Sequence, residues 1–79
     1  MNMKIEVLGS GCPKCRELER RVKEAVAKAR INGDVTHVYD IGEIIERGVI
    51  STPALLIDGK VVVSGRVPEV DELVKLLQK

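Results

Sequence analysis

Two cysteines offer the clearest chemistry in this sequence. Cys12 and Cys15 are its only thiols, and Pro13 and Lys14 separate them. A thiolate can attack a disulfide, and a second thiol nearby can then resolve the mixed disulfide that forms. Two thiolates can instead bind zinc or copper(I), because both metals accept sulfur ligands. The spacing alone therefore leaves redox chemistry and metal binding as the two candidate chemistries.

The residues on either side of the pair predict a strand, a loop and a helix. Residues 4–8 are rich in Ile, Val and Leu, and Gly-Ser-Gly at 9–11 follows them, which predicts a strand that ends in a tight loop. Pro13 stands where a first helical residue is expected. Apolar residues then recur at spacings of three and four, which is typical of an amphipathic helix: Cys15, Leu18, Val22, Ala25, Val26 and Ala29.

This placement distinguishes the two thiols. Cys12 falls at or just before the first helical turn, where unpaired backbone N–H groups and the helix dipole stabilise an anion. We therefore expect a lowered pKa and a nucleophilic role for Cys12. Cys15 falls one turn further along the buried stripe and is expected to remain a thiol that resolves the mixed disulfide. Pro13 fixes the backbone between them, and Lys14 is either a solvated charge or a further influence on the thiolate.

The next segment predicts a second strand. The helix is expected to end near Arg30 or Ile31, with Asn32 and Gly33 as its stop signal. Residues 35–39 are β-branched or aromatic apart from one histidine, which favours a strand. A strand, a helix and a strand in succession predict a parallel pair with a right-handed crossover.

The remainder predicts a short helix, a hairpin and a closing helix. A capping-box pattern begins at Asp40, and Gly48 ends the short helix. An Asp-Gly turn between the apolar runs 54–57 and 61–63 predicts an antiparallel hairpin. Pro68 opens the last helix, which has acidic residues in its first turn and lysines near its end. The predicted order is βαβαββα in one α/β domain over residues 1–79.

Several of these features together resemble the thioredoxin and glutaredoxin superfamily, and the resemblance covers nearly the whole chain. Its most similar members are the small thioredoxin-like redox-active disulfide proteins. The residues that carry it are a glycine and the cysteine motif, a Thr-Pro dipeptide before the hairpin, and a later glycine: Gly11, Cys12, Pro13, Lys14, Cys15, Thr52, Pro53 and Gly65. It implies a thioredoxin-like fold, with a four-stranded mixed sheet flanked by three helices.

The resemblance also implies a function and two further site residues. It implies a cis-proline at Pro53 that faces the cysteine pair, and a backbone at Thr52 that is offered to an extended substrate. The expected activity is that of a thiol-disulfide oxidoreductase in electron transport. Its partners would be a disulfide-containing client protein and an upstream reductase or small thiol, and no cofactor is expected.

Two other residues, Glu6 and Gly65, leave alternatives open. Glu6 lies six residues before Cys12, about where thioredoxins keep a buried acid that assists proton transfer from the resolving thiol. The more common alternative is an exposed carboxylate, because burial without a partner is costly. Gly65 either allows a close backbone approach beside the site or forms the turn into the last helix. His37 and Tyr39 are expected to have structural roles, in packing and at the surface.

The metal-binding alternative has less support than the redox one. The single histidine, His37, has no ligand-like spacing to the cysteines, so two thiolates supply only half of a tetrahedral zinc site. A dimer or a copper(I) site would complete it. A ferredoxin-like metal-binding domain has the order βαββαβ, whereas this chain is predicted to end in a helix. A redox sensor without turnover would use the same two cysteines.

Composition narrows the class of partner and the compartment. The net charge is +1, from 13 basic and 12 acidic residues, and neither sign forms a long run. Tyr39 is the only aromatic residue, so stacking on nucleic-acid bases is nearly excluded. No apolar segment approaches the roughly 18 residues of a membrane span. We expect a cytoplasmic monomer that binds neither nucleic acid nor membranes. In a reducing compartment, two cysteines are more often catalytic, redox-sensing or metal-binding than a structural disulfide.

Overall fold

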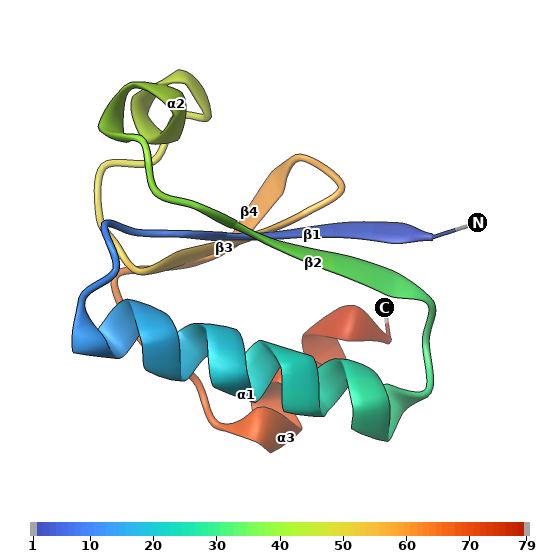
Figure 1. The fold of residues 1–79 in the computed structure, drawn as a ribbon. Helices are drawn as coiled ribbons and strands as arrows, with labels where there is room; N and C mark the ends of the chain where they lie inside the picture. The colour runs from blue at the N-terminus through green and yellow to red at the C-terminus, as the bar shows by residue number, and fades with distance from the viewer. Residues whose placement is uncertain (1, 79) are drawn as a thin grey trace.

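A four-stranded mixed sheet forms the centre of the molecule (Figure 1). The structure is a computed structural model that describes residues 2–78. The strands lie in the order β2-β1-β3-β4, and their bounds are Met3–Leu8 for β1, Gly33–Val38 for β2, Ala54–Ile57 for β3 and Lys60–Ser64 for β4. β1 is parallel to β2, whereas β3 is antiparallel to both β1 and β4. The predicted βαβαββα order and mixed sheet are confirmed.

Three helices cover the two faces of this sheet. Figure 1 shows α1 (Pro13–Ala29) and α3 (Val70–Leu77) on one face and α2 (Ile41–Glu46) on the other. Within residues 2–78, no helix is long and apolar enough to cross a membrane. Successive side chains of a strand point to opposite faces, so each strand contributes to both layers. On β1, Val7 packs under α1 and α3, and Leu8 packs under α2.

The two faces have cores of different size. The core beneath α1 and α3 consists of Ile5, Val7, Leu18, Val22, Ala25, Leu55, Val63, Leu73 and Leu77. The core beneath α2 consists of Leu8, Val38, Ile44, Val49, Ala54 and Leu56. Aliphatic side chains thus fill both cores, because the chain has a single aromatic residue. The larger core fixes α1, the helix that begins directly after Cys12 and includes Cys15.

The boundary between α1 and β2 differs from the prediction. The last helical residue is Ala29, and Arg30 caps the helix with a φ of 54°. Gly33, predicted as part of the stop signal, is already the first residue of β2 and pairs with Met3. A Cβ at Gly33 would lie 2.8 Å from Cδ1 of Ile5, so the glycine is needed for strand packing there. β2 therefore begins earlier than predicted and ends at Val38, which leaves Tyr39 outside the strand.

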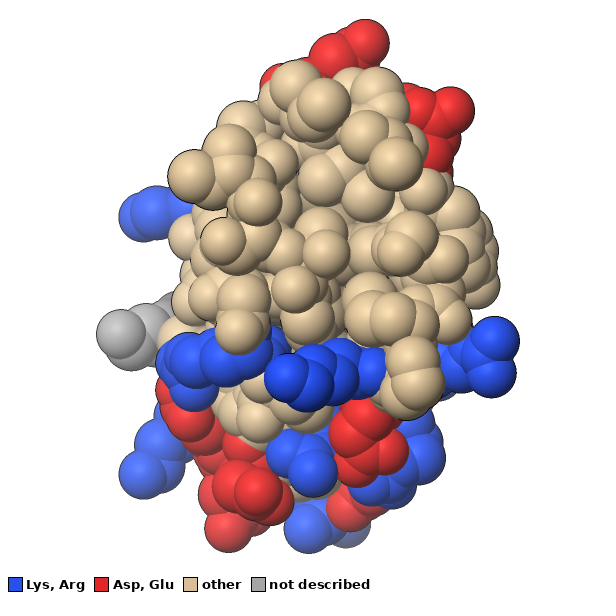
Figure 2. Space-filling model, turned by 90° about the vertical axis from the view of Figure 1, so that its left-hand side faces the viewer, with Lys and Arg blue, Asp and Glu red and all other residues tan. Residues whose placement is uncertain are grey.

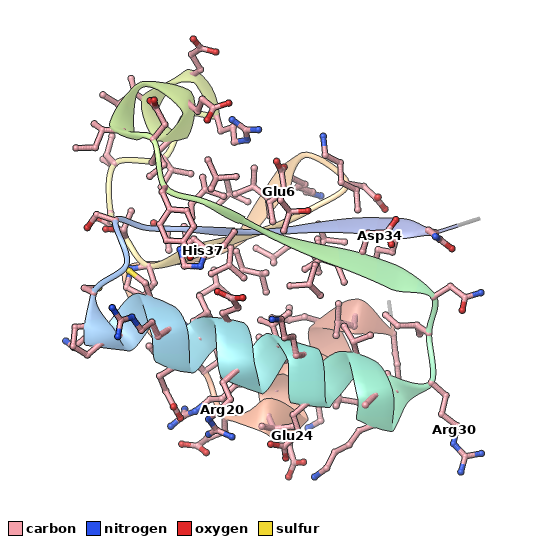
Figure 3. All side chains as sticks on the ribbon, in the orientation of Figure 1. Glu6, Arg20, Glu24, Arg30, Asp34 and His37 are labelled. Atoms are coloured by element: carbon pink, nitrogen blue, oxygen red, sulfur yellow. The ribbon has the colours of Figure 1, made fainter. Side chains whose placement is uncertain are left out.

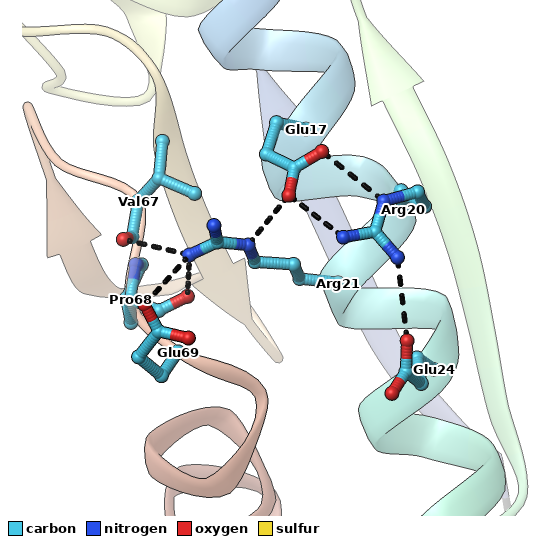
Figure 4. A network of polar contacts seen from close by, with 7 residues as sticks. All are labelled: Glu17, Arg20, Arg21, Glu24, Val67, Pro68 and Glu69. Atoms are coloured by element: carbon cyan, nitrogen blue, oxygen red, sulfur yellow. Dashed lines mark hydrogen bonds and ion pairs between the residues drawn. The ribbon is translucent and has the colours of Figure 1, made fainter.

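The start of the last helix differs from the prediction too, because α3 begins later. Its first residue is Val70 and its N-cap is Glu69, so Pro68 precedes the helix and does not open it. Figure 4 shows the reason: Arg21 of α1 reaches across to this segment. Its Nη1 donates hydrogen bonds to the carbonyl oxygens of Val67 and Pro68, at 3.3 and 3.1 Å. These bonds hold the approach to α3 against α1 in a non-helical conformation.

Two predicted local signals have the expected geometry. Asp58 and Gly59 have φ values of 50° and 82°, the positive values that the Asp-Gly hairpin turn requires. Asp40 is the N-cap of α2, and its Oδ1 accepts a hydrogen bond from the Glu43 N–H at 3.2 Å. α2 is short, and Gly48 follows its end with a φ of 78°.

Candidate active site

The two cysteines lie together at the start of α1. Cys12 is the N-cap of the helix, and its Sγ accepts a hydrogen bond from the Cys15 N–H at 3.4 Å. The two Sγ atoms are 2.7 Å apart, and both cysteines are free thiols. Cys12 is partly exposed, whereas Cys15 is fully buried in the stripe that faces the sheet. One sulfur can therefore meet a partner molecule while the other stays within reach behind it.

The surroundings shift the two thiols in opposite directions. The hydrogen bond with the Cys15 side chain, followed by that from the Cys15 backbone N–H, lowers the pKa of Cys12. Burial raises the pKa of Cys15, and the hydrogen bond with Cys12 adds to this effect. When one proton is shared between them, the charge resides on the sulfur at the helix start. Cys12 is thus the better nucleophile of the two.

Gly9 makes room for the buried thiol. A Cβ at this position would lie 2.2 Å from Sγ of Cys15 and 4.0 Å from Cβ of Thr52. A side chain there would displace the sulfur, so Gly9 is part of the site although the sequence analysis did not single it out. The buried stripe offered a signal, because it places Cys15 against the end of the first strand.

The Thr52–Pro53 segment also lies near Gly9. Its peptide bond is cis, and Pro53 is fully buried. The Gly65 N–H donates a hydrogen bond to the Pro53 carbonyl oxygen at 2.8 Å. Gly65 has a φ of 75°, and a Cβ there would lie 3.2 Å from Cβ of Ser51. Both features suggested for Gly65, the turn and the close approach, are therefore present at one residue.

The remaining predicted site residues surround Cys12. Pro13 is at the first position of α1, and both it and Lys14 are exposed. Gly11 lies next to the ring of Tyr39, because a Cβ at Gly11 would be 3.5 Å from Cε1 of Tyr39. The start of α1 thus lies close to residues that follow β1, β2 and β4 and to the segment that precedes β3.

Comparison with known proteins gives the family. Residues 3–78 match the family model described as thioredoxin domain. The chain belongs to the thioredoxin family. It is 35% identical over 75 residues to a thioredoxin of Methanothermobacter thermautotrophicus, a match that covers 95% of this chain and 97% of the relative. It is 38% identical over 69 residues to a thioredoxin of Methanocaldococcus jannaschii, covering 87% and 79% of the two chains.

A solved structure shows the same fold. The germline-specific thioredoxin Deadhead of Drosophila melanogaster superposes with a TM-score of 0.63 at 20% identity. The match covers 98% of this chain and 79% of the other. Together with the cysteine pair, the family makes this chain a thiol-disulfide oxidoreductase, as predicted.

Glu6 occupies a different position in this thioredoxin from either expectation. The more common alternative, an exposed carboxylate, is wrong, because Glu6 is only 4% exposed. Its Oε2 accepts hydrogen bonds from Nε and Nη2 of Arg47, at 3.1 and 2.9 Å. Figure 3 shows Glu6 and His37 on opposite sides of the sheet, with Glu6 on the side away from α1. Its hydrogen-bond partner is therefore a cation of the α2 region, and the charge is buried without being unpartnered.

His37 is more closely connected to the cysteine loop than the prediction of simple packing implied. Its side chain is 5% exposed, and its two ring nitrogens contact Glu19 and the Gly9 carbonyl oxygen. The parallel register could have revealed this, because His37 pairs with Val7, which packs under α1.

The described residues leave the cysteines without further metal ligands. Within residues 2–78, no three His, Cys, Asp or Glu side chains are grouped so that they could hold a metal ion. Both nitrogens of His37 are already engaged. A metal bound by this thioredoxin would therefore need ligands from outside the group that Cys12 and Cys15 form.

An apolar groove borders the site on the α2 side. It is a cavity of about 410 Å³ lined by Ser10, Ile41, Ile44, Ile45, Val49, Ile50 and Thr52. Ile41 and Ile45 are largely exposed, and Ile50 is 98% exposed. Figure 2 shows that uncharged atoms cover the upper part of this end of the molecule, with a band of lysine and arginine side chains below. An exposed group of large apolar side chains is typical of a surface that binds another molecule.

Proposed function

We propose that the chain reduces disulfides in client proteins, with Cys12 as the nucleophile and Cys15 as the resolving thiol. The observation that carries this proposal is the asymmetry of the pair. Cys12 is accessible and has a lowered pKa, whereas Cys15 is buried 2.7 Å behind it and has a raised pKa. An attacking thiol and a retained second thiol need this arrangement.

The proposed reaction has two displacement steps. The Cys12 thiolate attacks one sulfur of a client disulfide, which forms a mixed disulfide and releases the first client sulfur as a thiolate. Cys15 then gives up its proton and attacks Sγ of Cys12, which forms the Cys12–Cys15 disulfide and releases the second client sulfur. Counted from the protonated dithiol, the protein loses two electrons and two protons, one proton when Cys12 ionises and one from Cys15, and the two client thiolates take up two protons.

The client segment binds along the Thr52 side of the site. Thr52 lies next to Gly9 and lines the apolar groove, so an extended segment that meets the backbone of Thr52 would place an apolar side chain against Ile41, Ile45 or Ile50. Burying apolar surface there supplies affinity without a specific sequence requirement. An upstream reductase or a small thiol then returns the Cys12–Cys15 disulfide to the dithiol.

The same proposal includes a monomer in the cytoplasm. A reducing compartment keeps both thiols available for the next client, whereas an oxidising one would favour the disulfide. Light scattering of the purified dithiol protein should give the mass of a single chain. A stable dimer would contradict this part of the proposal.

Cysteine variants test the reaction. The wild type should reduce insulin disulfides catalytically with a dithiol as the electron source, and Cys12→Ser should abolish the activity. Cys15→Ser should accumulate a mixed disulfide through Cys12 that mass spectrometry can identify. Undiminished turnover by Cys12→Ser would refute the proposal.

Two further measurements separate the alternatives. Oxidation of the pair without turnover would indicate a redox sensor. Stoichiometric zinc or copper in freshly purified protein, lost in both cysteine variants, would indicate a metal-binding module.

A further inference from the structure

Gly9 is attached to β2 through both of its backbone polar groups. Its N–H donates a hydrogen bond to the Val38 carbonyl oxygen at 3.0 Å. Its own carbonyl oxygen lies 3.1 Å from Nε2 of His37. The first bond continues the pairing of β1 with β2, but the second depends on a side chain. Because Gly9 also packs against Sγ of Cys15, this side-chain bond acts directly on the cysteine site.

Each ring nitrogen of His37 lies beside an oxygen atom. Nε2 faces a carbonyl oxygen, and Nδ1 lies 2.5 Å from Oε1 of Glu19. Hydrogen bonds with His37 and Lys23 lower the pKa of Glu19, so its carboxylate is an acceptor as well. A carbonyl oxygen can only accept, so Nε2 bonds to Gly9 as an N–H donor, while Glu19 holds the other nitrogen of the ring.

Tyr39 extends this contact to the residue before Cys12. The rings of His37 and Tyr39 are stacked, with centroids 4.0 Å apart and planes 5° apart. Tyr39 also lies beside Gly11. The stacked pair therefore contacts both ends of the loop from Gly9 to Gly11, which leads directly into the N-cap cysteine.

We propose that His37, held by Glu19, is a positioning residue that fixes the Gly9–Gly11 loop and thereby the thiolate geometry of Cys12. This proposal rests on the proposed function for the roles of the two cysteines. The donor on Nε2 keeps Gly9 against Cys15, so the Cys15 N–H and side chain remain directed at Cys12. Without it, the loop is held at Gly9 by the backbone alone.

Glu19 fixes the orientation of the ring that carries this donor. Its carboxylate holds Nδ1, so Nε2 stays directed at the Gly9 carbonyl oxygen. The groups that face the ring are Glu19 from α1 with Lys23 behind it, Tyr39, and the Gly9 carbonyl.

Alkylation of Cys12 provides a readout that does not require disulfide reduction. The rate of reaction of the dithiol protein with iodoacetamide is measured across pH, with mass spectrometry to locate the label and ultraviolet absorbance to follow the thiolate. His37→Phe retains a ring beside Tyr39 but has no donor, and we expect alkylation at neutral pH to slow about fivefold, the equivalent of one hydrogen bond. His37→Gln supplies an amide N–H near the position of Nε2 and should restore the rate to within about twofold of the wild type.

Two alanine variants on α1 test the part that Glu19 plays. Glu19→Ala removes the carboxylate that holds Nδ1 of His37, so the alkylation rate, corrected for the thiolate fraction, should fall about threefold. Glu24→Ala is the matched control, because Glu24 also forms ion pairs on α1 but does not contact His37, and it should keep the wild-type rate.

These outcomes decide the proposal. Slow alkylation in folded His37→Phe with recovery in His37→Gln, and slower alkylation in Glu19→Ala than in Glu24→Ala, support it. Wild-type alkylation in folded His37→Phe, or equal rates in Glu19→Ala and Glu24→Ala, overturns it. If His37→Phe fails to fold, the comparison of the two glutamate variants still decides. Failure of the insulin assay would count against the proposed function and leave this test unaffected.

Discussion

Two pairs of an acidic and a basic side chain lie on opposite faces of the sheet, and they differ in their contacts with the cysteine site. Glu6 is buried under α2 and pairs with Arg47, and nothing in its hydrogen bonds leads to a cysteine. Glu19 is 25% exposed on α1 and pairs with His37, which binds the carbonyl of Gly9. The two pairs are buried to a similar extent, because Arg47 is 27% exposed and the His37 side chain only 5%, but only the second pair contacts the cysteine loop. Burial of a charge alone does not identify its role.

The largest expected effect is a loss of protein stability when the Glu6–Arg47 pair is broken. Arg47→Met leaves the Glu6 carboxylate without a cation, and we expect a loss of about 3 kcal/mol in the free energy of unfolding. The alkylation rate of Cys12 should not change, because the pair lies on the other face of the sheet. Urea unfolding and iodoacetamide kinetics measure the two quantities.

Two further variants make this test specific. Arg20→Met removes a cation from an exposed ion pair on α1 and should destabilise the protein much less than Arg47→Met. The double variant Glu6→Leu, Arg47→Met removes both charges and should recover most of the lost stability. Slower Cys12 alkylation in Arg47→Met would show that the two faces are coupled after all.

A smaller loss of stability is expected from the second pair. His37→Phe leaves Glu19 with Lys23 as a partner and with partial solvent exposure, so the free energy of unfolding should fall by only about 1–2 kcal/mol. Urea unfolding gives this value on the same scale as Arg47→Met. A loss larger than that of Arg47→Met would reverse the ranking of the two pairs.

The elements were predictable from the sequence because their signals are local. The Asp-Gly turn, the Asp40 cap and the apolar stripe of α1 each depend on residues a few positions apart. The start of α3 was not predictable in this way, because Arg21, over forty residues earlier in the chain, holds the carbonyls of Val67 and Pro68. A local rule for proline at a helix start could not include that contact.

The site was predictable to a similar extent. The cysteine motif and its position at a helix start are visible in the sequence, and the structure places Cys12 at the N-cap. Glu6 and His37 were harder to interpret, because their partners Arg47 and Glu19 come from other elements. Only the register of β1 and β2, together with the packing of the helices, brings these groups together.

Acid should reveal the contribution of the α1 ion pairs. Hydrogen bonds with Arg20 and Arg21 lower the pKa of Glu17 from 4.5 to about 2, and the pKa of Glu19 is lowered as well. A carboxyl whose pKa is lower in the folded than in the unfolded state stabilises the protein at pH values above its unfolded-state pKa. This contribution is lost as the pH falls through the folded-state pKa. Stability should therefore decline gradually from about pH 4.5 towards 2, and Glu17→Gln should flatten the decline. Urea unfolding across this range tests the slope, and a stability that rises on acidification would contradict the sign.

The smallest effect on stability is expected at the apolar groove, which the α2 face exposes beside the site. Ile50 is 98% exposed, so Ile50→Ser should change the free energy of unfolding by less than about 0.5 kcal/mol. If client side chains pack in the groove, KM for insulin reduction should rise about fivefold, because about 1 kcal/mol of apolar contact is lost. Val61→Ser is the matched control, since Val61 is exposed on β4 but does not line the groove. An equal change of KM in both variants would assign the effect to general surface hydrophobicity. A change in Ile50→Ser alone would show that the α2 face binds clients, whereas the α1 face holds the cysteine loop through His37.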